Sequence, residues 1–337
     1  VKLYRTGYQI HMNYKNKTAQ LLKKIVFNFN LNKENKNLLN ELSNLITKDH
    51  LNAIDHIIKI SGITPSLVGF HGQTIFHNPS SNESLQIGNG KLLASLSKIK
   101  VVSNFRENDI LHGGEGAPIA PIYHQLLIDN LKLELPCCFI NIGGVCNLSY
   151  WDGNKLIGFD LGPGNGLMDI YCQNKLNIPF DKFGIIASKG NPNLNLVNSF
   201  LKLPYFKKKY PKSLDRLEFL NFVTELELND FSSSEALATL LEFTVFSIIE
   251  GIKILPSIPK KIVIMGGGQL NQHLFNRIND SFLFEVVKAD DISIPGEFIE
   301  AELMAYLAVR KIKNLPITFP NTTGVKKACV GGEVNLV

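Results

Sequence analysis

The chain has 337 residues, of which 45% are hydrophobic and 19% charged, a balance typical of a folded globular protein and not of a disordered one. Its 35 Lys and Arg residues against 30 Asp and Glu residues give a formal net charge of +5. The lysine clusters are short and have no aromatic residues between them, so no nucleic-acid partner is expected. The length predicts two lobes, each with its own core.

The sequence contains no segment typical of a membrane span. Its most apolar stretch, residues 243–258, is interrupted by Glu250, Lys253 and Pro256, and therefore predicts a core helix. The first residues contain no apolar run typical of a secretory signal. The five cysteines show no Cys-x-x-Cys spacing, which favours free thiols in a reducing cytoplasm.

The first third of the chain predicts one long helix followed by strands. Residues 34–60 carry apolar side chains at helical spacing and end at Ser61-Gly62, a helix stop. Short apolar runs bounded by Gly, Asn or Pro then predict three strands of a mixed sheet, at residues 67–70, 84–87 and 101–102.

A second block of strands begins after Pro136. The elements expected from there on are strands at 137–144, 145–151 and 155–160, a helix at 234–254, a buried strand at 260–268 that ends in a triple glycine, and a helix at 297–313. Strand-rich blocks alternate with helices, so the fold class is α/β, with a boundary between residues 133 and 136.

Four glycine-containing turns follow directly on predicted strands. They contain Gly143-Gly144, Gly158 with Gly162 and Gly164, Gly266-Gly267-Gly268, and Gly331-Gly332. Glycine lets a ligand approach the backbone closely, and backbone N–H groups after a strand suit phosphate oxygens. One such turn is usually a hairpin, but four favour nucleotide binding. None matches the P-loop or the Rossmann fingerprint.

Asp160 is the carboxylate that the pattern singles out. It ends an apolar strand and precedes the stiff turn LGPGN. A rigidly held acid at this place could act as a base or orient water beside a phosphoryl group. The alternative, an aspartate that caps the turn, is equally compatible with the spacing.

Three more charged residues are candidates for substrate contacts. Arg106 follows a predicted strand and could bind a carboxylate or phosphate, whereas a surface pair with Asp109 is the simpler interpretation. Glu300 shares a helix face with Met304 and Ala308, which suggests a ligand or a buried pair. The histidines show no spacing typical of a metal site, so no metal ligand is assigned.

Nine segments occur in an order that resembles one known family. They are HGQTIFHNP (71–79), QIGNGKLLA (86–94), NFRENDILHGGEGAPIAPIYH (104–124), NIGGVCNLSY (141–150), GFDLGPGN (158–165), YPKSLDR (210–216), MGGGQLN (265–271), EAELMAYLAVR (300–310) and TTGVKKACVGG (322–332). From about Gly69 to Gly332 the chain resembles anhydro-N-acetylmuramic acid kinase, a member of the actin/hexokinase/Hsp70-like ATPase superfamily.

The resemblance implies a two-lobed actin/hexokinase-like (ribonuclease H-like) fold with a central cleft. The first lobe would comprise residues 1–134, completed by about 312–337, and the second lobe residues 135–311 with the nucleotide-binding turns. The implied activity uses ATP and water to open 1,6-anhydro-N-acetylmuramic acid and to phosphorylate its 6-oxygen. The products would be N-acetylmuramic acid 6-phosphate and ADP, in peptidoglycan recycling.

The resemblance also implies roles for individual residues. Asp160 matches the catalytic base that activates the attacking water, and Arg106, Asp109 and Glu300 match substrate contacts. The nucleotide contacts implied are Gly143, Gly144, Asn147, Gly162, Gly164, Asn165, Gly266, Gly267, Gly268 and Asn271. A divalent cation, expected to be magnesium, would accompany ATP, and a homodimer is the default assembly.

The chain also departs from the family pattern. The turn GTSxDG, which is the family's first phosphate loop on its amino-terminal strand, has no counterpart here, so the first lobe is expected to lack both. Asn89 and Asn104 stand where aspartate is usual, and Glu115 stands where glutamine is usual. These departures motivate an alternative, a truncated or decayed non-catalytic member that retains the fold. A third hypothesis is a kinase of the same superfamily that acts on another substrate.

Overall fold

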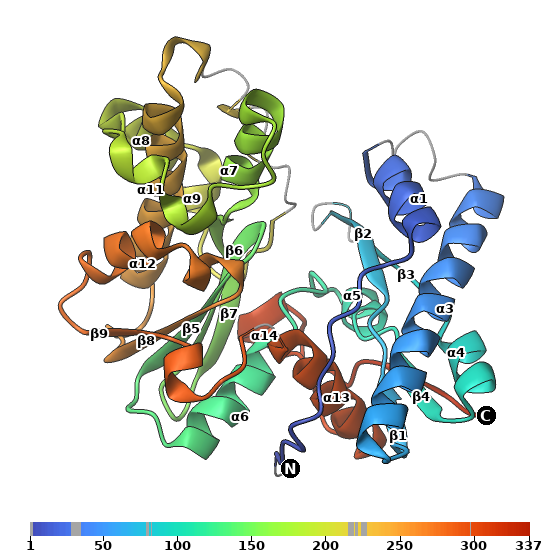
Figure 1. Ribbon diagram of the computed structural model, residues 1–337. Coiled ribbons are helices and arrows are strands. Elements are labelled where there is room, and N and C mark those ends of the chain that lie inside the picture. The colour runs from blue at the N-terminus through green and yellow to red at the C-terminus, as the bar shows by residue number, and fades with distance from the viewer. Residues whose placement is uncertain are drawn as a thin grey trace. The chain divides into compact units, whose positions relative to one another are not determined.

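The computed structural model describes residues 3–27, 35–78, 81, 83–214, 219, 222–223, 228–296 and 298–337 (Figure 1). Contacts divide this mixed α/β chain into two compact units. Unit 1 is Val1–Gly116, Glu300–Thr318 and Lys326–Val337, and unit 2 is Ala117–Ile299 and Phe319–Val325. The chain thus leaves unit 1 after Gly116, and the boundary expected from the sequence, between residues 133 and 136, falls inside unit 2.

Unit 1 contains two small sheets and five helices among its described residues. Its helices are α1 (Asn16–Phe27), α3 (Lys36–Ser61), α4 (Gly90–Ser97), α5 (Glu107–Leu111) and α13 (Ile299–Ile312). Strands β1 (Leu67–Gly69), β4 (Lys100–Ser103) and β10 (Glu333–Asn335) form a sheet in the order β1-β4-β10, with β1 parallel and β10 antiparallel to β4. The carboxy-terminal strand therefore completes this sheet.

The three early strands do not share one sheet, which corrects the expectation from the sequence. The strand at 84–87 is β3 (Glu83–Ile87), and it pairs antiparallel with β2 (Gln73–Asn78) in a separate sheet. β2 was not predicted because most of its residues are half-buried and show no clear alternation.

The long helix α3 confirms the helical spacing of residues 34–60. It begins where the Asn35 side chain accepts a hydrogen bond from the Leu38 N–H, and it ends at Gly62. Gly62 has φ 67°, the left-handed conformation that glycine adopts without strain at a helix end. Leu42 and Ile46 of α3 are fully buried in the core of unit 1.

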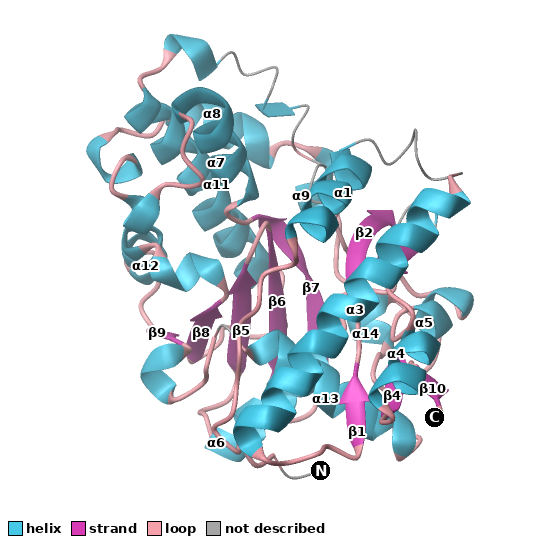
Figure 2. Cartoon of the chain, turned by 45° about the vertical axis from the view of Figure 1, so that its right-hand side comes forward, coloured by secondary structure: helices cyan, strands magenta, loops and turns pink. Residues whose placement is uncertain are grey.

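Unit 2 is built on a five-stranded sheet in the order β7-β6-β5-β8-β9 (Figure 2). The strands are β5 (Cys137–Ile142), β6 (Val145–Trp151), β7 (Leu156–Pro163), β8 (Lys261–Met265) and β9 (Glu285–Lys288). β5, β8 and β9 run parallel, while β6 is antiparallel to both β5 and β7. All but β9 were predicted.

Helices cover both faces of this sheet. On one face, α11 (Ser233–Lys253) packs so closely that a Cβ on its Gly251 would lie 2.0 Å from a Leu161 side-chain atom of β7. On the other face, a Cβ on Gly158 would lie 2.4 Å from Pro121 of α6 (Pro121–Leu131). The shorter helices of unit 2 are α7 (Gly166–Tyr171), α8 (Leu194–Leu201), α9 (Pro204–Lys207), α12 (Gln272–Asn279) and α14 (Pro320–Thr323).

The apolar segment at 243–258 supplies most of its length to α11, whose Phe243, Val245 and Ile248 are fully buried. The core-helix prediction is thus confirmed. No helix of the described ranges is long and apolar enough to cross a membrane. The five cysteines are free thiols in buried positions.

Candidate active site

Asp160 lies where the pairing of β7 with β6 changes register. Asn147 of β6 pairs with Asp160, but the preceding Cys146 pairs with Gly162, so β7 has one extra residue at this point. Such a bulge redirects side chains and is frequent beside active sites. Asp160 is 7% exposed and belongs to unit 2.

A segment far along the chain holds Asp160 in place. The Leu214 N–H donates to Asp160 Oδ2 at 2.7 Å, across 54 positions of sequence. The Tyr205 hydroxyl donates to the Asp160 carbonyl at 2.6 Å, and the Asp160 N–H donates to the Lys212 carbonyl at 2.9 Å. The carboxylate of Asp160 is therefore held by Leu214, and its backbone by Tyr205 and Lys212.

Two glycine turns lie against each other in unit 2. The turn Gly143-Gly144 joins β5 to β6, and its carbonyl groups accept hydrogen bonds from the segment after β7. The Gly143 carbonyl accepts from the Asn165 N–H at 2.7 Å, and the Gly144 carbonyl accepts from the Gly164 N–H at 3.0 Å. A Cβ on Gly164 would lie 2.2 Å from the Gly143 oxygen, so this contact requires glycine.

The third turn, Gly266-Gly267-Gly268, lies beside the end of β5. A Cβ on Gly266 would lie 2.4 Å from Asn141 Oδ1, and one on Gly268 would lie 2.4 Å from Ile142 Cβ. Gly266 also has φ 75°. The structure therefore brings the turns Gly143-Gly144 and Gly266-Gly267-Gly268 together with Gly164 in unit 2. Gly158 and Gly162 lie within strand β7 and not in a turn, which corrects the prediction, and Gly331-Gly332 belongs to unit 1.

Gly144 and Gly267 differ from these packed glycines. A Cβ on Gly144 would meet nothing within 4 Å, and one on Gly267 would meet only Asn165 Nδ2, at 3.7 Å. Neither has a positive φ, and within the described ranges their N–H groups have no hydrogen-bond acceptor. The protein's own packing thus does not require glycine at either position, whereas a bound phosphate would use both the open space and the N–H groups.

A buried polar atom directly after the triple glycine, Gln269 Oε1, could bind a polar ligand. Gln269 is 2% exposed, and its Oε1 has no hydrogen-bond partner among the described residues. Buried polar atoms without a partner are rare and are often completed by a ligand or water. Sequence reasoning did not single out Gln269, although it lies in the MGGGQLN segment.

The other predicted nucleotide contacts have visible structural roles. Gly162 packs against α11, where a Cβ would lie 2.3 Å from Ser247 Oγ. Asn271 caps α12 by accepting a hydrogen bond from the Leu274 N–H at 3.0 Å. Asn147 pairs with Asp160 in the sheet. Their contacts with a nucleotide stay predictions.

The described residues contain no group of three or more His, Cys, Asp or Glu side chains arranged to hold a metal ion. Magnesium commonly binds through one or two carboxylates together with substrate phosphates.

In unit 1, Arg106 is oriented by two segments. Its Nε donates to His71 Nε2 at 3.1 Å, and its Nη1 donates to the Gly116 carbonyl at 3.2 Å. Burial and the charge of Arg106 lower the pKa of His71 to about 3, so this imidazole is neutral. Since Nε2 accepts a hydrogen bond, the proton is on Nδ1, which lies 3.2 Å from the Gly72 carbonyl.

Asp109 shapes the loop that follows Arg106. Asp109 is fully buried, and its Oδ1 accepts a hydrogen bond from the Gly116 N–H at 2.8 Å. In that loop, Glu115 Oε2 is buried without a hydrogen-bond partner in the described part of the chain. Arg106 and Asp109 thus contact the same loop residue, and their roles toward a substrate stay predictions.

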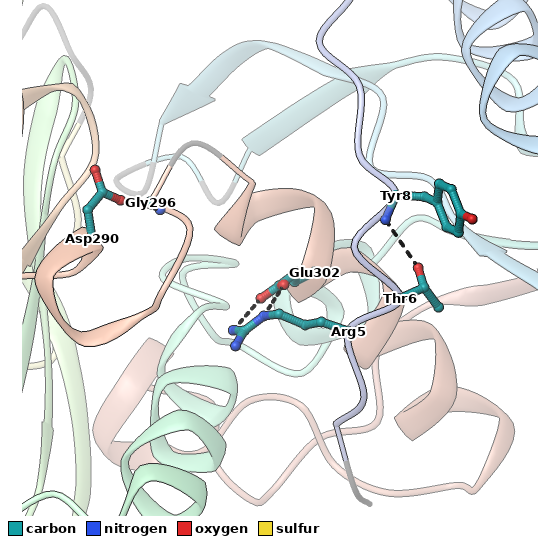
Figure 3. Close-up of polar contacts among 6 residues, drawn as sticks. All are labelled: Arg5, Thr6, Tyr8, Asp290, Gly296 and Glu302. Carbon is teal, nitrogen blue, oxygen red and sulfur yellow. Dashed lines mark hydrogen bonds and ion pairs between the residues drawn. The ribbon is translucent and has the colours of Figure 1, made fainter. Parts of the chain in front are cut away.

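Glu300 does not lie on the buried face of its helix, which corrects the expectation from the sequence. Its side chain is exposed and has no hydrogen-bond partner among the residues described. The neighbouring Glu302 instead forms a two-point ion pair with Arg5, in which Arg5 Nη2 lies 2.9 Å from Glu302 Oε2 (Figure 3). Glu300 as a sugar contact remains untested.

A held carboxylate at a bulge within a strand, together with glycine turns that have open N–H groups in the same α/β unit, is compatible with the class of nucleotide-dependent phosphotransferases. A family model described as anhydro-N-acetylmuramic acid kinase matches residues 9–336. The chain belongs to this family.

Individual relatives agree with the family model. The chain is 37% identical to the anhydro-N-acetylmuramic acid kinase of Zymomonas mobilis, over 88% of this chain and 81% of the relative. It is 39% identical to the protein of the same name from Pelagibacter ubique, over 89% and 81%. A solved ROK family glucokinase from Streptomyces griseus, in complex with glucose and AMPPNP, superposes with a TM-score of 0.36 at 13% identity, over 77% of this chain and 87% of that one.

Proposed function

We propose that this protein is an ATP-dependent kinase that hydrolytically opens 1,6-anhydro-N-acetylmuramic acid and phosphorylates its 6-oxygen. The observation that carries the proposal is the held carboxylate of Asp160, in the same unit as the open backbone N–H groups of Gly144 and Gly267. Family membership supplies the substrate, and this geometry supplies the groups that the reaction needs.

In the proposed reaction Asp160 acts as the general base. A water molecule attacks the anomeric carbon while Asp160 accepts its proton, and the bond between that carbon and the 6-oxygen breaks. The 6-oxygen forms a bond to the γ-phosphorus of ATP, and ADP leaves. Because the Leu214 N–H holds Oδ2, the carboxylate can keep one orientation throughout, which is the main requirement for a positioned base.

The nucleotide-binding part of the proposal rests on the glycine turns. The N–H groups of Gly144 and Gly267 are suited to phosphate oxygens, on which negative charge increases during transfer. A divalent cation would neutralise part of this charge when it is bound. In unit 1, the guanidinium of Arg106, oriented by His71, is suited to the carboxylate of the sugar's lactyl group.

We also propose that the reaction belongs to peptidoglycan recycling in the cytoplasm. Magnesium is the cation expected with ATP, and the homodimer expected from the sequence stays a prediction that light scattering would test.

The test is ATP-dependent conversion of 1,6-anhydro-N-acetylmuramic acid, followed by mass spectrometry of the product. For Asp160→Asn we expect kcat to fall at least ~100-fold with little change in nucleotide affinity, because the base is lost and the glycine turns are intact. Asp291→Asn is the matched control, since Asp291 is an exposed aspartate of the same unit.

Three outcomes are distinct. Conversion by the wild type and by the Asp291 variant, but not by the Asp160 variant, supports the proposal. Conversion that is equal in all three removes Asp160 from the mechanism. A folded wild-type protein that binds nucleotide but forms no product contradicts the kinase activity and favours a non-catalytic member of the family.

A further inference from the structure

Lys212 is a buried lysine in the segment that holds Asp160. It is 6% exposed, although lysine is almost never buried unless its charge is paired. It lies in the YPKSLDR segment, two positions before Leu214, which donates to the Asp160 carboxylate. The sequence pattern pointed to this segment, but it assigned no role to the lysine.

The ammonium group of Lys212 is enclosed by aromatic rings and a carbonyl. Its Nζ lies 4.3 Å from the centre of the Tyr205 ring and 5.8 Å from the centre of the Phe159 ring. Nζ also donates to the Tyr205 carbonyl at 3.4 Å. Ring faces stabilise a cation that has lost its water, so they offset part of the cost of burying this charge.

The groups around the Lys212 ammonium are the Tyr205 ring, the Phe159 ring and the Tyr205 carbonyl, and they adjoin Asp160. Phe159 precedes Asp160 in β7, and the Tyr205 hydroxyl donates to the Asp160 carbonyl at 2.6 Å. The Lys212 carbonyl accepts the Asp160 N–H at 2.9 Å. A shift of Lys212 would therefore act directly on the position of Asp160.

Two charged groups act on the Lys212 ammonium. Burial lowers the pKa of Lys212 to about 8, the nearby charge of Lys208 lowers this pKa as well, and Asp160 opposes both. Asp160 belongs to β7, whereas Lys208 directly follows α9 and lies 5.8 Å from the centre of the Tyr205 ring on which Lys212 also packs. The same attraction stabilises the ionised form of Asp160.

We propose that Lys212 is a positioning residue for the catalytic base: its ammonium group, packed on the Tyr205 ring whose hydroxyl holds the Asp160 carbonyl, keeps Asp160 in place, and this hold weakens when the amine loses its proton. The role rests on the proposed function, because Asp160 must act as the base for its position to control the rate. Lys212 acts through Asp160, and no contact of Lys212 with the substrate is needed.

The kinetic test compares the pH profile of kcat/KM for the wild type with three variants. In Lys212→Met we expect activity to fall at least ~10-fold, and the acid limb of the profile to move to higher pH because the carboxylate loses a nearby positive charge. Lys212→Arg keeps a charge that does not titrate, so its activity should persist at pH 9.5, where that of the wild type has declined.

Lys208→Met is the matched control. It removes a like charge near Lys212 and leaves the backbone hydrogen bond from the Lys208 N–H to the Tyr205 carbonyl in place, and it should move the alkaline limb of the wild-type profile to higher pH. Unfolding followed by the fluorescence of Trp151, the one tryptophan of the chain, would verify that each variant is folded. If the acid and alkaline limbs of the kcat/KM profile lie at the same pH in the wild type and in all folded variants, the proposal is overturned.

A second measurement does not depend on activity. The rate at which acetic anhydride acetylates Lys212, measured by peptide mass spectrometry over pH, reports the titration of the amine. We expect Asp160→Asn to move this titration to lower pH, because the carboxylate stabilises the ammonium ion. An unchanged titration overturns the coupling of Lys212 to Asp160, whereas an inactive wild type with the expected shift contradicts the proposed function alone.

Discussion

Gly144 and Gly164 differ in whether the surrounding protein leaves room for a side chain, so the same substitution at both positions tests whether Gly144 serves a ligand. In the variant Gly144→Ala the added Cβ meets no protein atom within 4 Å, and the backbone has no positive φ. In Gly164→Ala the added Cβ would lie 2.2 Å from the Gly143 oxygen. The two substitutions add the same methyl group to neighbouring turns of unit 2.

The contact distances at the two glycines predict different effects on stability and on nucleotide affinity. Without a clash, Gly144→Ala should change the free energy of unfolding by no more than about 0.5 kcal/mol, as is usual for substitutions away from packed groups. The same methyl group would occupy the space proposed for a phosphate, so we expect nucleotide Kd to rise at least ~10-fold, or about 1.4 kcal/mol. In Gly164→Ala the overlap with a backbone carbonyl must be relieved, which should cost about 1–3 kcal/mol of stability.

Two assays test the contrast. Urea unfolding followed by Trp151 fluorescence measures the stability of unit 2, which contains this tryptophan, and calorimetric titration with a non-hydrolysable ATP analogue measures affinity. A Gly144→Ala protein that is stable and binds the nucleotide as tightly as the wild type does would refute the assignment of this turn to phosphate. A strongly destabilised Gly144→Ala protein would refute the claim that the position is open.

Two further predictions concern stability. Burial lowers the pKa of His124 to about 3, below the ordinary value of 6.5, so the unfolded chain takes up a proton that the folded chain does not. The contribution of neutral His124 to stability is therefore present above pH 6.5 and should fall by about 2 kcal/mol at pH 5. A smaller difference in stability between the wild type and His124→Gln at pH 5 than at pH 7 would verify this. The Asn104 side chain donates through Nδ2 to the Glu333 carboxylate at 2.8 Å. Asn104→Asp should replace this hydrogen bond by the repulsion of two carboxylates and lower the free energy of unfolding by about 1 kcal/mol. Equal melting temperatures of the variant and the wild type would contradict this prediction.

Local patterns were sufficient to predict most of the sheet of unit 2. β5 and β8 are apolar and nearly fully buried, and such runs between turn residues are typical of central strands. Asp160 was singled out because an apolar run and a glycine-rich segment adjoin in sequence, although β7 continues past it to Pro163. β9 escaped prediction, since it has only four residues and begins and ends with a charged one.

The partners of Asp160 could not be predicted, because they come from contacts between distant segments. Leu214 lies 54 positions away, and no local pattern shows that its N–H, or the Lys212 ammonium, lies near the carboxylate. The same holds for His71 and Arg106, which are 35 positions apart. A resemblance to a family identifies the relevant segments, but it does not show which of their side chains are in contact.

The error at Glu300 has a geometric cause. Residues four apart on an α-helix are rotated by about 40° from each other, because each turn has about 3.6 residues, so Glu300 and Ala308 are about 80° apart on the helix surface. The buried stripe of α13 follows Ile299, Leu303 and Leu307. A single acid near such a stripe therefore lies beside the buried face and not on it.

Three residues of unit 1 that depart from the family pattern, Asn89, Asn104 and Glu115, differ in their hydrogen bonding. Asn89 accepts a hydrogen bond from the Leu92 N–H at the start of α4, a cap that asparagine and aspartate provide equally well. Asn104 has φ 56°, a conformation that asparagine tolerates, and it bonds to Glu333. Both asparagines thus satisfy the positions they occupy, so neither is evidence of a decayed fold. Glu115 differs from both, because its Oε2 is buried without a hydrogen-bond partner in the described chain.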